Sequence, residues 1–332
     1  MAGSVHIIAE MACSHEGSPD CGRTIIERAS QAGADSIQFQ IWKLDEMVVP
    51  HHEKYDLLSE IEMSYDQWRG LAEHVWAQDH VMDIIACVYE QHSVEFAKDL
   101  GVEAYKIHSS DLSNPHLLKR VAGTGKRIDL SVGGSTLDEI QTAIQWIRGA
   151  SGSDIWLMYG YQDFPTRPDD VHLDYMMKLR DLFELPIGYQ DHSAGGSSEG
   201  YWLPAAAVGA GVDVVEKHIT HDRSFQGIDH EAALNPNEFE EFARMVRQVE
   251  AAKGESAPRP FSEEEKAYRA SVKKSVVASQ NLFEGKTLTE EDLAFRRTDE
   301  LGMFPDSVNE LIGKTLNRSI EAYHLIQPGD VS

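Results

Sequence analysis

Short apolar runs alternate with longer amphipathic stretches between residues 5 and 252. The apolar runs are typical of strands, and the stretches between them repeat apolar residues at helical spacing. The predicted strands end near Glu10, Gln40, Cys87, Ile107, Ser131, Tyr159, Gln190 and His218. The predicted helices include 21–32, 65–78, 92–100, 137–148, 170–182, 199–208 and 237–252.

This alternation predicts an α/β protein built as a (β/α)8 TIM barrel, because eight strand–helix units over about 250 residues is the usual size of that fold. A doubly wound open sheet is the alternative. That fold more often carries a glycine-rich dinucleotide turn, and no G-x-G-x-x-G follows the first predicted strand. In a barrel all strands end at one mouth, so the polar residues at the strand ends are expected to share a site.

The composition changes after Lys253, and this change sets the predicted domain boundaries. Residues 254–266 (GESAPRPFSEEEK) are rich in proline and acidic residues and predict a linker. Residues 267–332 contain strand-like runs such as SVVAS and LAFRR and predict a small β-rich domain. A module of about 60 residues is marginally stable alone, so we expect it to pack on something larger. The barrel is assigned to residues 1–253.

The chain carries 55 acidic and 30 basic residues and a net charge of −25. Such a surface repels phosphate backbones and anionic lipids, so neither nucleic acid nor a membrane is expected as a partner. No stretch reaches the roughly 20 apolar residues of a membrane span, and the first residues read into a strand without the basic region of a signal peptide. The three cysteines, Cys13, Cys21 and Cys87, are odd in number and form no C-x-x-C pair. A cytoplasmic protein is expected.

Two predicted strands end in a histidine with acidic residues beside it. Segment 186–192 runs from a short strand into His192, and segment 214–234 runs from an apolar strand into His218. Either histidine alone is more often a hydrogen-bonded structural residue, but the two strand ends together favour a metal site. Glu10 ends the first strand and suits a metal-bound water or a proton transfer. A salt bridge that closes the barrel floor is the alternative for Glu10.

Polar residues of the fourth and fifth strands suit an anionic substrate. Lys106, with Ser109 beyond it, offers charge and a hydroxyl donor to a phosphate or carboxylate. The alternative is that Lys106 pairs with a neighbouring acid such as Glu216. Ser131 precedes a Gly-Gly pair whose backbone N–H groups can approach an anion, or which forms a plain turn.

Two further features suit a polar or hydroxylated ligand. Gln38 and Gln40 alternate on the second strand and therefore face one side. The loop at 159–166 (YGYQDFPT) after the sixth strand is aromatic and polar. The glutamines can equally fill the barrel, and the loop can equally be a packed surface loop.

Several segments occur in the order seen in sialic acid synthases, namely IIAEMACSHEG, GADSIQFQIWK, AYKIHSSD, LSVGG, the FPTRPDDV run, IGYQDHSAG and EKHITHDRSFQGIDHEAALNPNEF. The C-terminal part resembles the antifreeze-protein-like (SAF) domain of those enzymes. The resemblance implies a transferase that condenses phosphoenolpyruvate with an open-chain sugar aldehyde, typically an N-acylmannosamine, to give a sialic-acid-like 3-deoxy-2-keto acid and phosphate. Arg297 matches the arginine that one subunit's small domain inserts into its partner's barrel, which implies a domain-swapped homodimer.

The resemblance also implies a role for each matching residue. His192 and His218 would hold a divalent metal, usually Mn²⁺, with Mg²⁺ and Co²⁺ as alternatives. Glu10 matches the glutamate near the metal and its water, and Asp229 matches the aspartate after the eighth strand. With Lys106, which offsets charge on the donor, these are the expected catalytic residues. The matching substrate contacts are Gln38, Gln40, Cys87, Ser109, Ser131, Gln162, Phe164 and Gln190.

The chain departs from the family pattern around the donor. Family members commonly carry lysine, threonine and serine where this chain has Gln38, Cys87 and Gln190. The usual Asn-x-Tyr-Pro of the sugar-binding loop is QDFP at 162–165. A divergent subfamily is therefore expected. Two alternatives stay open, a metal-dependent aldolase that uses pyruvate or another enol donor, and a non-catalytic sugar-binding relative.

Overall fold

The structure is a computed structural model that describes residues 4–332. It divides into two compact units, Met1–Gly254 and Glu255–Ser332. Residues 1–3, the start of the predicted barrel domain, lie outside the described residues. In the described part of the chain, no helix combines the length and the apolar character needed to cross a bilayer.

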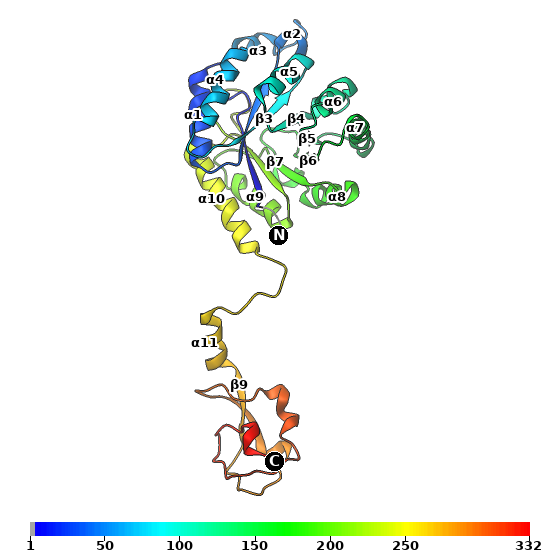
Figure 1. The fold of residues 1–332 in the computed structure, drawn as a ribbon. Helices are drawn as coiled ribbons and strands as arrows, with labels where there is room; N and C mark the ends of the chain where they lie inside the picture. The colour runs from blue at the N-terminus through cyan, green and yellow to red at the C-terminus, as the bar shows by residue number, and fades with distance from the viewer. Residues whose placement is uncertain (1–3) are drawn as a thin grey trace. The chain divides into compact units, whose positions relative to one another are not determined.

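Eight parallel strands close into a barrel in the first unit, which confirms the predicted fold (Figure 1). Each strand pairs with the next along the chain, and β1 closes the barrel by pairing with β8. The strands are β1 (His6–Glu10), β2 (Ser36–Ile41), β3 (Asp83–Val88), β4 (Ala104–Ile107), β5 (Arg127–Ser131), β6 (Ile155–Tyr159), β7 (Ile187–Asp191) and β8 (Val214–His218).

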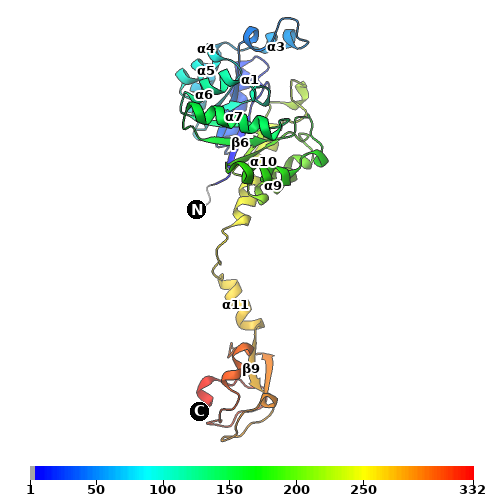
Figure 2. The ribbon, with the colours of Figure 1, turned by 90° about the vertical axis from the view of Figure 1, so that its right-hand side faces the viewer.

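Helices surround the barrel, and a side view shows them along the outside of the strands (Figure 2). They are α1 (Pro19–Gln31), α2 (Leu44–Met47), α3 (Tyr55–Ile61), α4 (Tyr65–Trp76), α5 (Gln91–Leu100), α6 (Pro115–Ala122), α7 (Leu137–Ala150), α8 (Leu173–Phe183), α9 (Glu199–Ala210) and α10 (Pro236–Lys253). Capping residues set several starts. Ser64 and Gln67 form a capping box at α4, and Thr136 and Glu139 form one at α7.

Alternation along the strands sorts the side chains into two layers. Outward residues such as Ile7 and Phe39 join the large apolar core beneath the helices. Inward residues form a smaller apolar cluster made of Ile8, Ile85, Ala104, Met158 and Val214. The next inward residue on these strands, two positions further on, is polar on β1, β4 and β8. The barrel is thus filled by apolar side chains below and lined by polar ones at its carboxyl end.

The second unit is built around β9 (Lys274–Ala278) and β10 (Leu293–Arg297), which pair antiparallel. Its apolar core consists of Val276, Ala278, Leu282, Leu288, Leu311, Leu316, Ile320, Ile326 and Val331. Helix α11 (Glu263–Val272) begins inside the segment that we expected to be linker. Ser262 and Glu265 form a capping box there, and three acidic residues occupy the first turn, where the helix dipole favours negative charge.

Candidate active site

A cavity opens at the carboxyl ends of the barrel strands, where the sequence predicted a shared site. Its lining combines most of the predicted site residues with two others, His108 and Glu216. The lining residues are Glu10, Gln38, Gln40, Cys87, Lys106, His108, Ser131, Gln162, Phe164, Gln190, His192, Glu216, His218 and Asp229.

Two predicted site residues lie elsewhere among the described residues. Ser109 begins a 3-10 turn (Ser109–Asp111) directly after β4 and is half-buried outside the cavity lining. Alternation continues from Lys106 to His108, two residues further on, so His108 lines the cavity and Ser109 does not. Arg297 is the last residue of β10 in the second unit and is exposed there.

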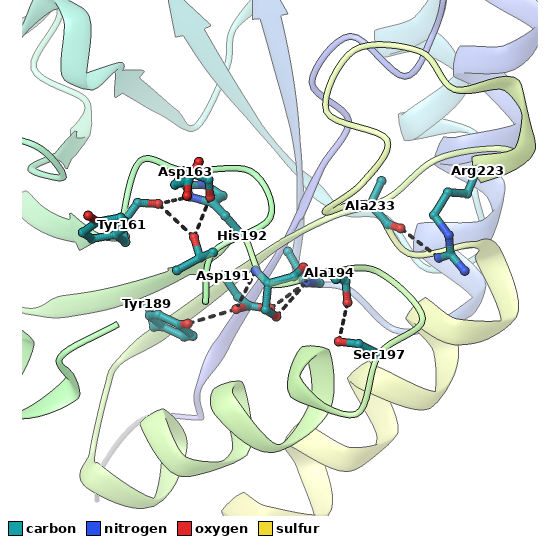
Figure 3. A network of polar contacts seen from close by, with 12 residues as sticks. Tyr161, Asp163, Tyr189, Asp191, His192, Ala194, Ser197, Arg223 and Ala233 are labelled. Carbon is teal, nitrogen blue, oxygen red and sulfur yellow. Dashed lines mark hydrogen bonds and ion pairs between the residues drawn. The ribbon is translucent and has the colours of Figure 1, made fainter. Parts of the chain in front are cut away.

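His192 and His218 lie side by side at the ends of the neighbouring strands β7 and β8. Both are buried, and their ring centroids are 5.5 Å apart. The Nδ1 of His192 donates to the carbonyl oxygen of Tyr161 at 2.8 Å (Figure 3), which leaves Nε2 as the free ligand atom. The Nδ1 of His218 is buried and has no hydrogen-bond partner within residues 4–332. The Phe164 ring packs against the His192 ring, with 4.2 Å between the two ring centroids.

Both imidazoles are held in the neutral form that a metal ligand requires. Burial lowers the pKa of His192. Burial lowers the pKa of His218 well below its ordinary value, and the nearby His192 and Lys217 lower it further. A fixed tautomer at one ring and an unpartnered buried nitrogen at the other, with carboxylates in the same cavity, fit a divalent cation that accepts nitrogen and oxygen ligands.

Glu10 ends β1 and is the register partner of His218 on the neighbouring strand β8. Its Oε1 accepts from the backbone N–H of Ala12 at 2.6 Å and from the amide of Gln40 at 3.3 Å. Burial, and then the nearby Glu216 carboxylate, raises the pKa of Glu10 well above its ordinary value. Burial also raises the pKa of Asp229. Glu10 in particular therefore keeps a proton to higher pH than an ordinary carboxyl group, which suits a group that exchanges protons with substrate.

Lys106 forms an ion pair with Glu216, with 2.6 Å between Nζ and Oε2. This ion pair is the alternative to a direct role of Lys106 in substrate binding. The other oxygen of Glu216 accepts from the Gln190 amide at 2.9 Å, and the Gln190 carbonyl accepts from the Ser131 hydroxyl at 2.9 Å. Burial lowers the pKa of Lys106, but the nearby Glu216 and Glu10 together outweigh burial and the net direction is upward. A chain of polar contacts therefore runs across the cavity from Lys106 on β4 to Glu216 on β8, and from there through Gln190 on β7 to Ser131 on β5.

Glu216 and His108 were not predicted as site residues. A signal for Glu216 was present in the sequence, because it precedes His218 by two positions on one strand and must share its inward face. His108 carried the same signal, because it follows Lys106 by two positions. Gln38 extends the polar lining, and its Oε1 is buried without a hydrogen-bond partner among the described residues.

The Gly-Gly pair after β5 has a packing role in the structure. A Cβ at Gly133 would lie 2.1 Å from the carbonyl oxygen of Gly160 and 2.7 Å from the Gln162 amide nitrogen. Only glycine therefore permits the loops after β5 and β6 to approach each other this closely.

Other titratable residues near the eighth strand have structural partners. Arg223 pairs with Glu238 at the start of α10 and donates to the carbonyl oxygen of Ala233 (Figure 3). Asp222 accepts from the backbone N–H of Ser224. Among the described residues of that loop, Asp229 lines the cavity.

A separate group of potential ligands lies outside the cavity lining. Ligand atoms of Glu46, Glu90 and His92 all lie within 4.8 Å of one another. His92 pairs with Glu46 at 2.7 Å, and Glu90 accepts from Ser93 at the start of α5. These contacts account for the grouping without an ion.

Comparisons with known proteins identify both units. Residues 25–257 match the model of the NeuB family, and residues 273–332 match that of the SAF domain. The N,N'-diacetyllegionaminic acid synthase of Legionella pneumophila is 30% identical over 334 residues, which cover 95% of this chain and 91% of that protein. The human N-acetylneuraminate-9-phosphate synthase is 30% identical over 329 residues, which cover 95% of this chain and 89% of that protein.

A crystal structure shows the same likeness in three dimensions. It is that of the N-acetylneuraminic acid (sialic acid) synthetase from Leptospira borgpetersenii serovar Hardjo-bovis in complex with citrate. It matches with a TM-score of 0.73 and 30% identity, over 82% of this chain and 93% of that chain.

Proposed function

The chain belongs to the NeuB family, and we propose that it catalyses the metal-dependent condensation of phosphoenolpyruvate with an open-chain sugar aldehyde. The products are a sialic-acid-like 3-deoxy-2-keto sugar acid and phosphate. The family confirms the resemblance to sialic acid synthases, and the relatives named above make legionaminic acids or N-acetylneuraminate 9-phosphate. The observation that carries the proposal is a cavity that joins His192 and His218, whose pKa values are lowered, the ammonium group of Lys106 and the carboxyl group of Glu10, whose pKa is raised.

The reaction forms a bond between C3 of the donor and the aldehyde carbon, and the aldehyde oxygen takes up a proton. Water adds at C2 of the donor, and cleavage of the C2–oxygen bond releases phosphate. The site must therefore bind the donor, the aldehyde and a water molecule, and it must supply a proton.

His192 and His218 would hold the metal, which we propose to be Mn²⁺. When bound, a divalent cation supplies Lewis-acid polarisation of the aldehyde oxygen. The described protein ligands are few, which suits a catalytic rather than a structural site, because catalytic sites leave positions open for water or substrate.

The protein's own groups supply charge and protons. Lys106 and the Ser131 hydroxyl would bind the acidic groups of the donor and offset its negative charge. Glu10, whose buried carboxyl favours its protonated form, would hold the proton that moves to the aldehyde oxygen. Asp229, Gln40, Gln162 and Phe164 would contact the sugar. We further propose that Arg297 of a second subunit completes this end of the site in a homodimer.

The charge of the same cavity also fits the aldolase alternative. Lys106 is already paired with Glu216, and Gln38 is neutral, so little uncompensated positive charge awaits a triply ionisable donor. A donor with less negative charge, such as pyruvate, would need less positive charge in the site. The three free cysteines are consistent with a reducing compartment, and we propose a cytoplasmic location.

The decisive experiment incubates the protein with Mn²⁺, phosphoenolpyruvate and a panel of aldoses that includes N-acetylmannosamine, and a parallel reaction contains pyruvate in place of phosphoenolpyruvate. Phosphate and keto acid are measured together. Equal amounts of both, dependent on the aldose, are the expected result. Keto acid from pyruvate without phosphate release would establish the aldolase. Neither product from any aldose would establish a binding protein.

A further inference from the structure

We propose that the buried ion pair between Asp191 and Lys217 positions His192 and His218, and thereby sets the affinity of the cavity for a divalent cation. Asp191 directly precedes His192, and Lys217 directly precedes His218. Asp191 and Lys217 are also direct partners in the register of β7 and β8. The role assigned to the pair rests on the metal site of the proposed function.

The pair lies on the opposite face of the sheet from the histidines. Side chains alternate along a strand, so the histidines face the cavity while Asp191 and Lys217 face the helix layer. Their side chains are 1% and 0% exposed. Gly200, in the first turn of α9, covers them, since a Cβ there would lie 3.7 Å from Nζ of Lys217. No part of the pair therefore touches the reacting groups.

Every strong contact of the two charges is made within one small network. The ammonium group of Lys217 donates to Oδ2 of Asp191 at 2.6 Å and to the carbonyl oxygen of Ser193 at 2.9 Å. Asp191 also accepts from the Tyr189 hydroxyl at 2.9 Å and from the Ser193 hydroxyl at 2.7 Å (Figure 3). The network joins β7, the first residue beyond His192, and β8.

The two histidines depend on this network to different degrees. The His192 ring has its own hydrogen bond to Tyr161, and its backbone carbonyl accepts from Thr166 at 2.9 Å. The buried Nδ1 of His218 has no hydrogen-bond partner among residues 4–332. Its position therefore follows from its backbone, whose carbonyl accepts from the N–H of Leu234 at 2.9 Å and whose neighbour Lys217 ties β8 to β7. The distance between the two ligand atoms depends on that tie.

A contribution to the stability of the fold does not by itself explain the buried ion pair between Asp191 and Lys217. Desolvating two charges offsets much of their attraction, and well-packed apolar residues in place of a buried ion pair are often as stabilising. What an apolar pair cannot supply is direction, because charge-assisted hydrogen bonds hold the two side chains in one geometry at the end of the β7–β8 ladder. Residues that orient metal ligands from behind commonly change metal affinity by tenfold to a hundredfold.

The test is the double variant Asp191→Leu/Lys217→Met, which removes both charges together and leaves neither buried alone. Metal-free proteins are titrated with Mn²⁺, and binding is followed by the electron paramagnetic resonance signal of free Mn²⁺. Thermal unfolding of each variant is measured beside it. We expect the double variant to fold cooperatively but to bind Mn²⁺ at least about tenfold more weakly.

Two controls separate positioning from general loosening. Arg127→Met/Asp129→Leu removes another ion pair with a fully buried carboxylate from the same barrel, on β5, which carries no histidine. Tyr189→Phe removes one hydrogen bond to Asp191 and leaves the ion pair in place. Both should keep a dissociation constant for Mn²⁺ within about threefold of the wild type, which is well below the expected effect.

Three outcomes are decisive. A folded double variant with wild-type Mn²⁺ affinity would overturn the positioning role alone. An equal loss of affinity in the Arg127/Asp129 control would show that any disturbance of the barrel weakens the site, and would also overturn it. A wild type that binds no Mn²⁺ would overturn the metal assignment in the proposed function, and the positioning role with it.

Discussion

Lys106 and Glu216 form an ion pair 110 residues apart in the sequence, at the centre of the cavity, with 2.6 Å between Nζ and Oε2. Their side chains are 2% and 3% exposed, so water competes little with the contact. An anionic donor that binds Lys106 must therefore compete with Glu216. Glu216 therefore competes with the donor for Lys106, which is the only cationic side chain that we assign to donor binding.

The first prediction is that Glu216→Gln tightens the binding of phosphoenolpyruvate about tenfold, because a charge-assisted hydrogen bond is worth about 1.5–3 kcal/mol. The amide keeps the size of the side chain and a contact to Gln190 while it removes the competing charge. Calorimetric titration with phosphoenolpyruvate measures the effect. Glu216→Asp, which retains the charge, is the control and should stay closer to the wild type. Weaker donor binding by Glu216→Gln would mean that Glu216 is needed to hold Lys106 in place.

The second prediction is that His192 and His218 share one divalent ion. His192→Ala and His218→Ala should each lose bound Mn²⁺ and metal-dependent turnover while keeping a folded barrel, because each removes a ligand from a set of few. Metal analysis after dialysis and circular dichroism measure the two properties. His108→Ala is the matched control, since His108 lines the same cavity but is assigned no metal. Unchanged metal content in both single variants would refute the assignment.

The third prediction concerns Gln38, where sialic acid synthases commonly carry lysine. Gln38→Lys should lower the KM for phosphoenolpyruvate about tenfold, because it restores a positive charge beside the buried donor site. The preference among sugars should change little. Steady-state kinetics with the donor and the aldose varied separately tests both statements. Lower turnover, with wild-type preference for pyruvate, would contradict the donor assignment.

The fourth prediction is that the second unit acts on the barrel of another subunit through Arg297. Mixed dimers of inactive Arg297→Ala and inactive His218→Ala protomers should recover part of the activity, because one of their two sites combines an intact barrel with an intact arginine. Two affinity tags isolate the heterodimer for assay. Tagged homodimers of each variant serve as controls. No recovery, or a monomer by light scattering, would contradict the prediction.

The strands were predictable to within about one residue because each apolar run ends in polar residues at the barrel mouth. Helix α6 was not among the predicted ranges because it has only eight residues, although Asn114 and Pro115 mark its start and Leu117, Leu118 and Val121 form its buried face. Alternation correctly brought Gln38 and Gln40 to one face, because both line the cavity.

The sequence left two roles open for Lys106, substrate binding and pairing with an acid such as Glu216, and the structure shows the ion pair. Alternation gives the face of Lys106 and of Glu216, but it does not say which inward acid lies within reach of the ammonium group. That choice depends on strand tilt and on the lengths of the side chains. Ser109 was expected in the site from the family resemblance, but it begins a 3-10 turn and lies outside the cavity lining.

The last prediction concerns the pH dependence of stability at His15, which packs against Trp68 with 5.2 Å between ring centroids. Its Nδ1 accepts from the backbone N–H of Gly17 at 3.0 Å, and its buried Nε2 has no partner among the described residues. Burial lowers the pKa of His15 to about 4.

Below pH about 6.5 the unfolded chain takes up a proton at His15 that the folded protein refuses, so the free energy of unfolding falls as the pH is lowered from about 6.5 to about 4 and then levels off for this residue. The contribution is about 3 kcal/mol, because each pKa unit corresponds to about 1.4 kcal/mol. His15→Asn keeps an acceptor for Gly17 but cannot titrate, so its loss of stability over this range should be smaller by that amount. All six tryptophans lie in Met1–Gly254, so urea unfolding followed by tryptophan fluorescence reports on the barrel unit. Other buried histidines contribute equally to both proteins, and parallel curves for wild type and His15→Asn between pH 6.5 and 4 would show that His15 is protonated in the fold.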